Sequence, residues 1–459
     1  MNLPAFASRG LRVPQYRRAE VRSRIVHIGV GGFHRSHMAL YTDDLAHRGS
    51  EWRICGLGIL PNDRQMASAL AAQDHLYTVI ERHDDTAVAT IVGSVTEFCL
   101  ADHDLSVGAH RIADPTIEIV SLTITEGGYA VAADGTPPRA IDMIVDALEL
   151  RRFAGCPGVT VLSCDNLPGN GDVAREAVRN AAALRSSGIA QWIDEQCTFP
   201  NSMVDRITPM TADSDREWLR AAYGVDDRWP VVGEAFRQWV IEDNFAQTRP
   251  AWELAGALFT DDVHAWELYK LRMLNAAHSN MAYLCHLAEI EFVDEGLADP
   301  IVRNYLERFL ANEAIPTLTP IPGFPCEDYA KSVLERFSNT GVRDQIARLC
   351  QSGTAKYPIF LIPTLHAQLE AGGPIGDATL ALAAWARYLA IVPAEHQAMD
   401  ISGDAARAFA IKAVGDPLAF LDFAEVFPAN IRDHPRFRDE FATTAANLAE
   451  NGPRAAMLG

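Results

Sequence analysis

The sequence lacks closely spaced cysteines. Its eight cysteines are scattered along 459 residues, and no two of them form a C-x-x-C pair. This scatter excludes a disulfide framework and a zinc-ribbon site, because both need cysteines at short, regular spacings. We therefore expect reduced cysteines in a cytoplasmic protein, with no metal ion bound.

Long apolar runs are also missing. The longest, LALAAWARYLAIV at 380–392, is too short to span a bilayer and contains Arg387. The arginine-rich start of the chain has no apolar core of the secretory type, so no secretory signal is expected. The run at 380–392 is thus predicted to be a buried helix rather than a membrane segment.

Positive charge is scarce. The chain has 40 Lys and Arg against 60 Asp and Glu, a formal net charge of −20. A surface of this sign repels nucleic acid and anionic membranes, so neither is expected as a partner. Apolar residues make up 48% and charged residues 22%, as in a soluble enzyme, and the length predicts two or three domains.

Short β-branched runs alternate with helix-like segments in the first half of the chain. The predicted strands are RIVHIGV (24–30), EWRICGLG (51–58), LYTVIER (76–82), TIEIVSLTIT (116–125) and GVTVLSCDN (158–166). These runs are almost continuously apolar, as in a parallel sheet buried on both faces. The alternation predicts an α/β fold. Residues 1–264 are expected to form an N-terminal arm and a Rossmann-like doubly wound domain, and residues 265–459 a mostly α-helical domain.

A glycine-rich turn follows the first predicted strand. IVHIGVGGFHRSH places Gly29, Gly31 and Gly32 before a helical pattern, with His34 where G-x-G-x-x-G would have its last glycine. Such a turn lets backbone amides approach a pyrophosphate at a helix N-terminus. The turn predicts a dinucleotide site, although a plain strand–turn–helix corner remains open.

Two other side chains near this turn have alternative interpretations. Arg35 could contact phosphate or pack locally. Asp63 comes after the second predicted strand, where an acidic residue binds the ribose hydroxyls in dinucleotide-binding domains. It could equally be the N-cap of the helix that follows.

The stretch YKLRMLNAAHSN (269–280) sets three polar residues into an apolar, helix-favouring run. At 100° per residue, Asn275 lies about 140° and His278 about 80° from Lys270. Glu267 falls near the same face. A solvated polar stripe is the alternative. Neutral Asn and His are uncommon on such a stripe, and the segment lies where the α/β pattern gives way to the helical one.

This combination fits hydride transfer with a lysine base. Oxidising a secondary alcohol requires removal of the hydroxyl proton as hydride leaves the same carbon. A lysine does this near neutral pH only if desolvation lowers its pKa. An asparagine amide then stabilises the developing alkoxide, as in an oxyanion hole.

The chain resembles the polyol-specific long-chain dehydrogenase/reductase family, that is, the mannitol dehydrogenase family. The resemblance covers roughly residues 25–365 and depends on motifs in the family's order: GVGGFHRSH, SLTITEGGY, SCDNLPGNG, FPNSMVDRITP, QWVIEDNF, KLRMLNAAH, ERFSN and GTAKYP. It implies a zinc-independent, often monomeric oxidoreductase that uses NAD and an open-chain polyol or ketose. The leading reaction is D-mannitol with NAD⁺ to D-fructose with NADH.

The resemblance implies roles for individual residues. Lys270 would be the general base, Asn166 and Asn275 would hold the reacting oxygen, and His278 would orient a neighbouring hydroxyl. The substrate's other end would meet Asp205, Arg348 and Lys356, and a proton relay would use Glu126 and Glu267. The cofactor residues would be Gly29, Gly31, Gly32, Phe33, Arg35 and Asp63.

Each role has a structural alternative. Arg348 could be a helix-surface arginine, Asp205 could pair with Arg206, and Asn166 could start a turn. Lys356 lies between Gly and Pro residues and is predicted to be in a loop. Asn62, beside Asp63, is acidic in some relatives, so NADP tolerance stays open.

Other functions remain open as well. A uronate reductase acting on D-fructuronate or D-tagaturonate would use Arg348 and Lys356 to bind a carboxylate. D-arabinitol and sorbitol dehydrogenases belong to the same family. A non-catalytic dinucleotide-binding protein is disfavoured because the Lys and Asn set is intact, and a zinc-dependent dehydrogenase is disfavoured by the missing ligand cluster.

Overall fold

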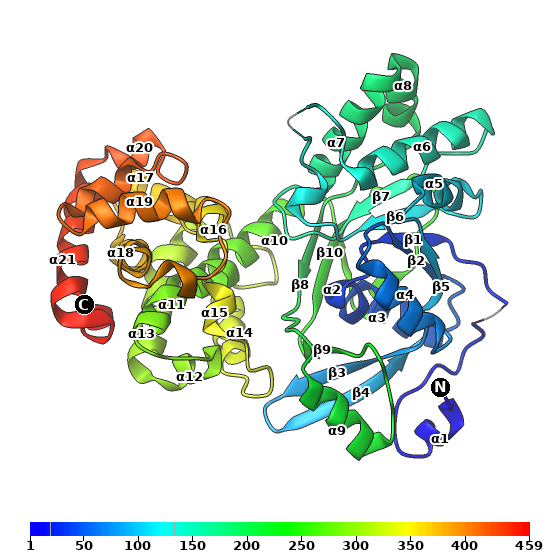
Figure 1. Ribbon diagram of the computed structural model, residues 1–459, viewed down its shortest axis with the longest axis horizontal. Coiled ribbons are helices and arrows are strands. Elements are labelled where there is room, and N and C mark those ends of the chain that lie inside the picture. The colour runs from blue at the N-terminus through cyan, green and yellow to red at the C-terminus, as the bar shows by residue number, and fades with distance from the viewer. Residues whose placement is uncertain (19, 133) are drawn as a thin grey trace. The chain divides into compact units, whose positions relative to one another are not determined.

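The computed structural model describes residues 1–18, 20–132 and 134–459 (Figure 1). The chain divides into two compact units, Met1–His264 and Ala265–Gly459. The first unit is built on β-sheets, and the second is helical (Figure 1). The predicted fold class, a Rossmann-like doubly wound domain followed by a mostly helical one, is confirmed.

A five-stranded parallel sheet forms the centre of the first unit. Its order is β5-β2-β1-β6-β7, so β1 lies between β2 and β6. The strands are β1 (Ile25–Ile28), β2 (Ile54–Gly58), β5 (Val95–Leu100), β6 (Ile119–Leu122) and β7 (Thr160–Ser163). Because all five run in the same direction, the loops that follow them meet at one edge of the sheet.

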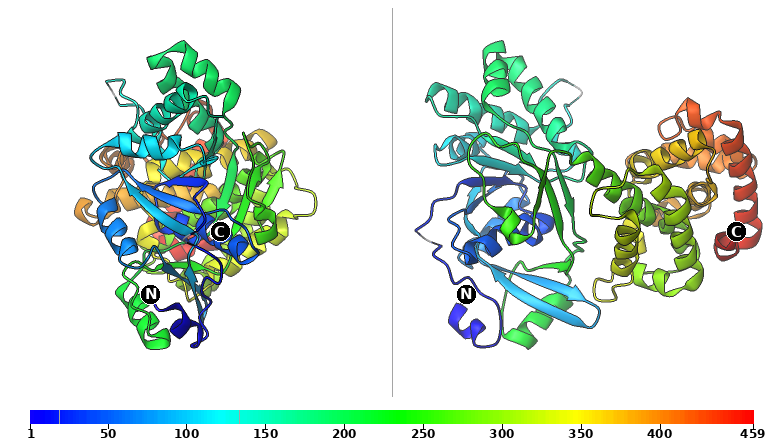
Figure 2. Two further views of the ribbon diagram at one scale, coloured as in Figure 1. Left: turned by 90° about the vertical axis from the view of Figure 1, so that its right-hand side faces the viewer. Right: turned by 180° about the vertical axis from the view of Figure 1, so that it is seen from behind.

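Both faces of this sheet are buried, which explains the continuous apolar runs. Neighbouring residues of one strand belong to opposite cores: Val26 packs with α5–α8, whereas Ile25 packs with α3. Figure 2 shows α6, α7 and α8 (cyan to green) on one side of the parallel strands. The helices of this unit are α1 (Leu3–Ala7), α2 (Gly32–Ser36), α3 (Met38–His47), α4 (Asp63–Ala71), α5 (Leu105–Ala113), α6 (Arg139–Phe153), α7 (Asn170–Arg185), α8 (Ser187–Gln196) and α9 (Asp213–Tyr223).

One predicted strand lies outside the parallel sheet. The run 76–82 forms β3 (Tyr77–His83), which pairs antiparallel with β4 (Thr86–Val92) and parallel with β9 (Val231–Glu234). The fifth strand of the parallel sheet is instead β5, an edge strand whose residues are mostly half-buried. A half-buried edge strand lacks a continuous apolar run, so this strand was missed.

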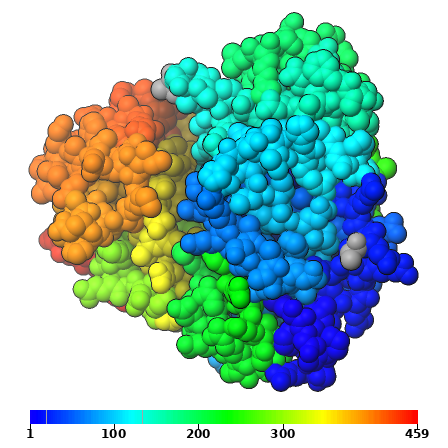
Figure 3. Space-filling view, turned by 45° about the vertical axis from the view of Figure 1, so that its right-hand side comes forward, coloured from blue at the N-terminus to red at the C-terminus, as the bar shows by residue number. Residues whose placement is uncertain are grey.

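A third sheet completes the first unit. It has the order β11-β10-β8 and consists of β8 (Ser202–Asp205), β10 (Gln238–Glu242) and β11 (Leu258–Thr260). The N-terminal arm lies against this unit (dark blue in Figure 3), where Arg12 pairs with Asp44 and Arg18 with Asp74 at 2.7 Å. These ion pairs attach the arginine-rich arm to acidic side chains of the unit.

The second unit is a bundle of helices around α18 (Gly376–Ile391). Almost all of α18 is buried, and it packs against α11, α19 and α21 (Figure 1). The apolar run at 380–392 is therefore a buried helix, as predicted. None of the helices among the described residues combines the length and apolar character needed to cross a membrane.

The other helices of this unit are shorter than α18, except for α21, which is longer. Within the domain that the sequence predicts to be mostly helical, residues 342–345 and 350–352 on either side of α15 are not helical. The bounds are α10 (His264–Tyr269), α11 (Ala276–Leu287), α12 (Val293–Ala298), α13 (Pro300–Phe309), α14 (Cys326–Phe337), α15 (Ile346–Leu349), α16 (Gly353–Phe360), α17 (Ile362–Ala371), α19 (Gly403–Ala413), α20 (Ala429–Arg432) and α21 (Pro435–Leu458).

Candidate active site

The glycine turn connects β1 to α2. Gly29 has φ +91°, and a Cβ at this position would lie 2.2 Å from the carbonyl oxygen of Thr123. Only glycine fits there. The Gly31 amide donates to the Gly29 carbonyl at 2.6 Å, and a Cβ built on Gly31 meets no atom closer than 3.8 Å. The space beside the Gly31 Cα is thus open, so a pyrophosphate can come close to the backbone there.

A buried histidine pair explains why the third glycine is absent. His34 stacks on His27 with ring centroids 3.4 Å apart. His27 in turn bonds Ser121 Oγ at 2.8 Å and Thr123 Oγ1 at 3.0 Å. Burial lowers the pKa of His27 to about 3, so the pair is neutral. His34 therefore fills the space beneath the glycine turn.

Arg35 and Phe33 pack locally. The Arg35 side chain is buried and donates to the carbonyl oxygens of Gly31, at 3.3 Å, and Trp229. Phe33 stacks on the ring of His37. For Arg35, local packing is the alternative that these contacts favour.

Asp63 is the first residue of α4 and lies just after β2. Its Oδ2 accepts hydrogen bonds from the Ile59 and Leu60 amides, both at 2.8 Å. The helix is preceded by Asn62, so Asp63 does not occupy the N-cap position. Asp63 instead holds the loop that follows β2, at the edge where a ribose binds in this fold.

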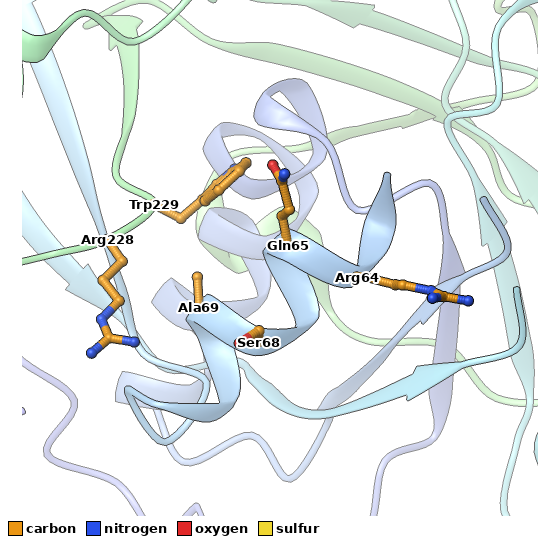
Figure 4. A pocket seen from close by; sticks show the side chains of 6 residues that line it. All are labelled: Arg64, Gln65, Ser68, Ala69, Arg228 and Trp229. Atoms are coloured by element: carbon orange, nitrogen blue, oxygen red, sulfur yellow. The ribbon is translucent and has the colours of Figure 1, made fainter. Parts of the chain in front are cut away.

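Beside Asp63, Arg64 has an acidic partner. It pairs with Asp102, in the loop after β5, and this hydrogen bond lowers the pKa of Asp102. A hollow of about 440 Å³ lies on the neighbouring face of α4 (Figure 4). It is lined by Arg64, Gln65, Ser68, Ala69, Arg228 and Trp229, none of which is a sequence-predicted site residue.

Glu126 and Asn166 are placed by neighbouring strands. Glu126 begins a short 3₁₀ turn, Glu126–Gly128, after β6, and Asn166 follows β7. Both are exposed. Since β1, β2, β6 and β7 are parallel members of one sheet, these two residues share an edge with the glycine turn and Asp63.

Asp205 ends β8 and is 2% exposed. Its neighbour Arg206 is fully buried and pairs with Glu81 at 2.6 Å. The start of β8 is tied to the end of β7, because Ser202 Oγ donates to the Ser163 carbonyl at 2.6 Å. The structure thus connects the strand of Asp205 to the edge that carries Asn166.

In the second unit, Lys270, Asn275 and His278 lie on one continuous helical segment. Residues Lys270–Asn275 form a π-helix between α10 and α11, not the α-helix that the sequence predicted. The angles of 140° and 80° therefore do not apply, because a π-helix bonds residue i to i+5 and brings residues five apart onto one face. Lys270 is 8% exposed and Glu267, in α10, is 5% exposed.

His278 lies near three cationic side chains. Its ring stacks on Phe337 with centroids 4.0 Å apart. Burial, followed by the charges of Arg348, Arg336 and Lys356, lowers the pKa of His278 well below its usual value. His278 is therefore neutral.

Two neutral side chains of this helix carry a buried polar atom without a hydrogen-bond partner. His278 Nε2 and Asn275 Oδ1 are both buried, and neither has a hydrogen-bond partner within the described part of the chain. Buried polar atoms are nearly always satisfied in folded proteins. A ligand with hydroxyl groups would satisfy both.

Arg348 and Lys356 lie near His278, and each donates to a hydrogen-bond acceptor of its own. Arg348, in α15, donates to Asp344 through Nε at 2.6 Å and also through Nη2. Lys356 Nζ donates to the Leu349 carbonyl at 3.0 Å. Burial, together with the charge of Arg348, lowers the pKa of Lys356 to about 8. The predicted loop at Lys356 is wrong: α16 includes both Gly353 and Pro358.

Several residues near the candidate site were not predicted from the sequence. Arg336 and Phe337 belong to the ERFSN motif, to which no residue role was given. Asp344 precedes Arg348 by four residues, a spacing that predicts a helical ion pair. Asp165, beside Asn166, accepts three hydrogen bonds from the loop after β6. A buried carboxylate of this kind has no recognisable sequence pattern.

The described residues contain no group of side chains suited to a metal ion. Within residues 1–18, 20–132 and 134–459, no three His, Cys, Asp or Glu side chains are grouped so as to hold an ion. All eight cysteines are free thiols.

Comparisons with known proteins cover both units. Residues 23–254 match the family model described as the mannitol dehydrogenase Rossmann domain, and residues 262–449 match the mannitol dehydrogenase C-terminal domain. The mannitol 2-dehydrogenase of Phaeosphaeria nodorum is 39% identical over 97% of this chain and 82% of its own length. That of Aspergillus terreus is 36% identical over 96% and 94%.

Solved structures give the same result. A Pseudomonas fluorescens mannitol 2-dehydrogenase in ternary complex with NAD and D-mannitol is 38% identical, with a TM-score of 0.89 over 98% of this chain and 96% of that one. A substrate-free D-sorbitol dehydrogenase is 33% identical, with a TM-score of 0.87 over 97% of both chains.

Proposed function

Since the chain belongs to the mannitol dehydrogenase family, we propose that it is an NAD-dependent polyol dehydrogenase that interconverts D-mannitol and D-fructose. The observation that carries this proposal is the helix with Lys270, Asn275 and His278. A buried lysine and two buried, unpartnered polar atoms of neutral side chains lie within nine residues of one helix. The relatives named mannitol 2-dehydrogenase supply the substrate hypothesis.

The first unit has features that fit NAD. The open space at Gly31 would let the pyrophosphate approach the glycine turn, and the Asp63 carboxylate would bind the adenosine ribose. NAD⁺, when bound, supplies the hydride acceptor. A negative charge at Asp63 disfavours the 2′-phosphate of NADP, and the neighbouring guanidinium of Arg64 is already paired with Asp102.

We assign the proton transfer to Lys270. Lys270 is 8% exposed, and in this role it would take the hydroxyl proton of the substrate as a neutral amine. Asn275 and Asn166 would bind the same oxygen and stabilise the developing alkoxide. Neutral His278 would bind a neighbouring hydroxyl through Nε2. Glu126 and Glu267 would relay the lysine's proton to solvent.

The far end of the substrate would meet Asp205, Arg348 and Lys356. The charge of Arg348 is already balanced by Asp344, and Lys356 is easily deprotonated, with its pKa at about 8. These two features favour an uncharged polyol over a sugar acid. Arg348 and Lys356 then act mainly as hydrogen-bond donors to hydroxyl groups of the substrate, and the Asp205 carboxylate accepts.

A uronate reductase is the second candidate. It is supported by the three cationic side chains whose charges reach His278: Arg348, Arg336 and Lys356. Such a cluster could bind the carboxylate of D-fructuronate or D-tagaturonate.

A substrate panel separates the two candidates. Purified protein is mixed with NADH or NADPH and with D-fructose, D-fructuronate or D-tagaturonate, and loss of reduced-nicotinamide absorbance is followed. Oxidation of D-mannitol, D-sorbitol and D-arabinitol is measured with NAD⁺. We expect the highest kcat/KM with NADH and D-fructose. A higher kcat/KM with a keto-uronate would replace the proposal with the second candidate.

A further inference from the structure

Two loops at the rim of the parallel sheet are joined through one buried carboxylate. Asp165, after β7, is 6% exposed. Its Oδ1 accepts from the Thr125 amide at 2.7 Å, and its Oδ2 accepts from the Ile124 amide at 3.1 Å and the Tyr129 hydroxyl at 2.7 Å. These donors lie on either side of the short 3₁₀ turn Glu126–Gly128 in the loop after β6. Asp165 thus holds the two sides of this turn together.

The loop contains a strained residue. Thr125 has φ +61° and ψ 173°, a region that is essentially restricted to glycine and is unfavourable for a β-branched side chain. Such a conformation persists only where the surrounding structure holds it. The hydrogen bond from the Thr125 amide to Asp165 is the contact that holds it here.

The carboxylate is itself fixed. The Asn170 side chain donates to the Asp165 carbonyl at 2.9 Å and to the Ser202 carbonyl at 2.7 Å. Tyr129 also bonds Ser163 Oγ at 2.8 Å, and burial followed by the charge of Asp165 raises the pKa of Tyr129. Asp165 therefore connects a rigid part of β7 and α7 to the strained loop.

Glu126 and Asn166 each lie one residue from this hydrogen-bonded set. Glu126 follows Thr125, and Asn166 follows Asp165. We propose that Asp165 is a positioning residue that sets the relative placement of Glu126 and Asn166 by holding Thr125 in its strained conformation. The inference rests on the proposed function, which gives Glu126 and Asn166 their roles. Asp165 itself is not expected to contact the substrate or the cofactor.

The test variant is Asp165→Asn. The amide keeps the size of the carboxylate but replaces one acceptor oxygen with a donor, so the Ile124 or the Thr125 amide loses its partner. Asp172→Asn is the matched control, because Asp172 is an exposed carboxylate of the same segment that bonds only the Asn201 side chain among the contacts described for it. We expect kcat for D-mannitol to fall on the order of 10- to 100-fold in Asp165→Asn and to stay within about twofold in the control.

Two further readouts separate positioning from general loss of structure. Amide hydrogen exchange of the peptide that covers 123–129 should become at least about tenfold faster in Asp165→Asn, because its donors lose an acceptor. The Kd for NADH should stay within about twofold of the wild-type value. The pH profile of kcat should also shift, since the predicted relay residue Glu126 is displaced.

A second substitution tests the strain directly. Thr125→Gly removes the backbone penalty, so the double variant Asp165→Asn/Thr125→Gly should recover several-fold of the lost kcat. The proposal is overturned if loop exchange or kcat is unchanged in Asp165→Asn. It is equally overturned if kcat, NADH affinity and melting temperature fall together and Thr125→Gly restores none of them.

If the proposed function is wrong, the measurements give a different result from the one that overturns the role of Asp165. If the wild-type protein oxidises no polyol with NAD⁺, the roles of Glu126 and Asn166 are lost, whereas the exchange measurements still show whether Asp165 holds the loop.

Discussion

Lys270 and Asn275 are the first and last residues of a single π-helical turn. In an α-helix a five-residue step would separate these side chains by about 140°, whereas the i to i+5 bonding of a π-helix brings them onto one face. The turn is anchored by Arg272, whose Nη1 donates to the Thr317 carbonyl at 2.7 Å. A proposed base and a proposed oxyanion partner are thus aligned by the helix itself.

Lys270→Ala should abolish turnover without preventing cofactor binding. Loss of a general base costs about 10²- to 10⁴-fold in kcat, and the glycine turn that would bind NAD belongs to the other unit. Turnover is measured with D-mannitol and NAD⁺, and NADH binding by fluorescence. Lys331→Ala, an exposed lysine on α14, is the control. Near-normal turnover in Lys270→Ala would falsify the base assignment.

Asp63→Asn should raise the relative use of NADP. The substitution keeps an oxygen for the Ile59 and Leu60 amides and removes the charge that repels a 2′-phosphate. We expect the kcat/KM ratio of NADP to NAD to rise about tenfold. Asp172→Asn should leave this ratio unchanged. An unaltered ratio in Asp63→Asn would show that another residue sets cofactor choice.

Inhibition by a sugar carboxylate should depend on the protonation of Lys356. Its lowered pKa, about 8, makes it an ammonium below pH 8 and an amine above it. A carboxylate that binds there loses its ion pair as pH rises, so the inhibition constant of D-gluconate against D-fructose should increase above pH 8. The increase should not exceed about tenfold per pH unit.

Lys356→Met provides the comparison for this pH series. It should give weaker, pH-independent inhibition, whereas the surface variant Lys331→Met should behave as the wild type. Inhibition that is flat with pH in the wild type would place the carboxylate elsewhere.

Exhaustive chelation should leave turnover intact. A lysine base and amide donors need no Lewis acid to take up a hydroxyl proton. Activity is measured before and after dialysis against a chelator, with and without added zinc. Activity that is lost on dialysis and restored by zinc would refute the metal-independent mechanism.

The parallel sheet was largely predictable because burial on both faces imposes continuous apolar runs. Four of the five predicted runs form β1, β2, β6 and β7. The run at 76–82 is equally apolar, yet it pairs with β4 and β9. Apolar composition reports that a strand is buried but carries no information on its hydrogen-bonding partner.

Predictions from local sequence patterns were wrong or missing where tertiary contacts decided the structure. Gly353 and Pro358 around Lys356 predicted a loop, whereas both are accommodated in α16. The π-helix at Lys270 has no propensity signature, since all of its residues except Asn275 also favour an α-helix. Asp165 was not identified because its three donors lie about 40 residues earlier in the chain.

The sequence by itself determined the α/β alternation of the first unit, the helical character of the second, the family, and the residue types available for chemistry. These follow from local burial periodicity and from motifs that stay together along the chain. Only the tertiary structure decided that Lys270 and Asn275 share a π turn, that Asp344 balances Arg348, and that Asp165 holds the Thr125 loop. Contacts of this kind depend on distances in space, which the separation of residues along a chain does not encode.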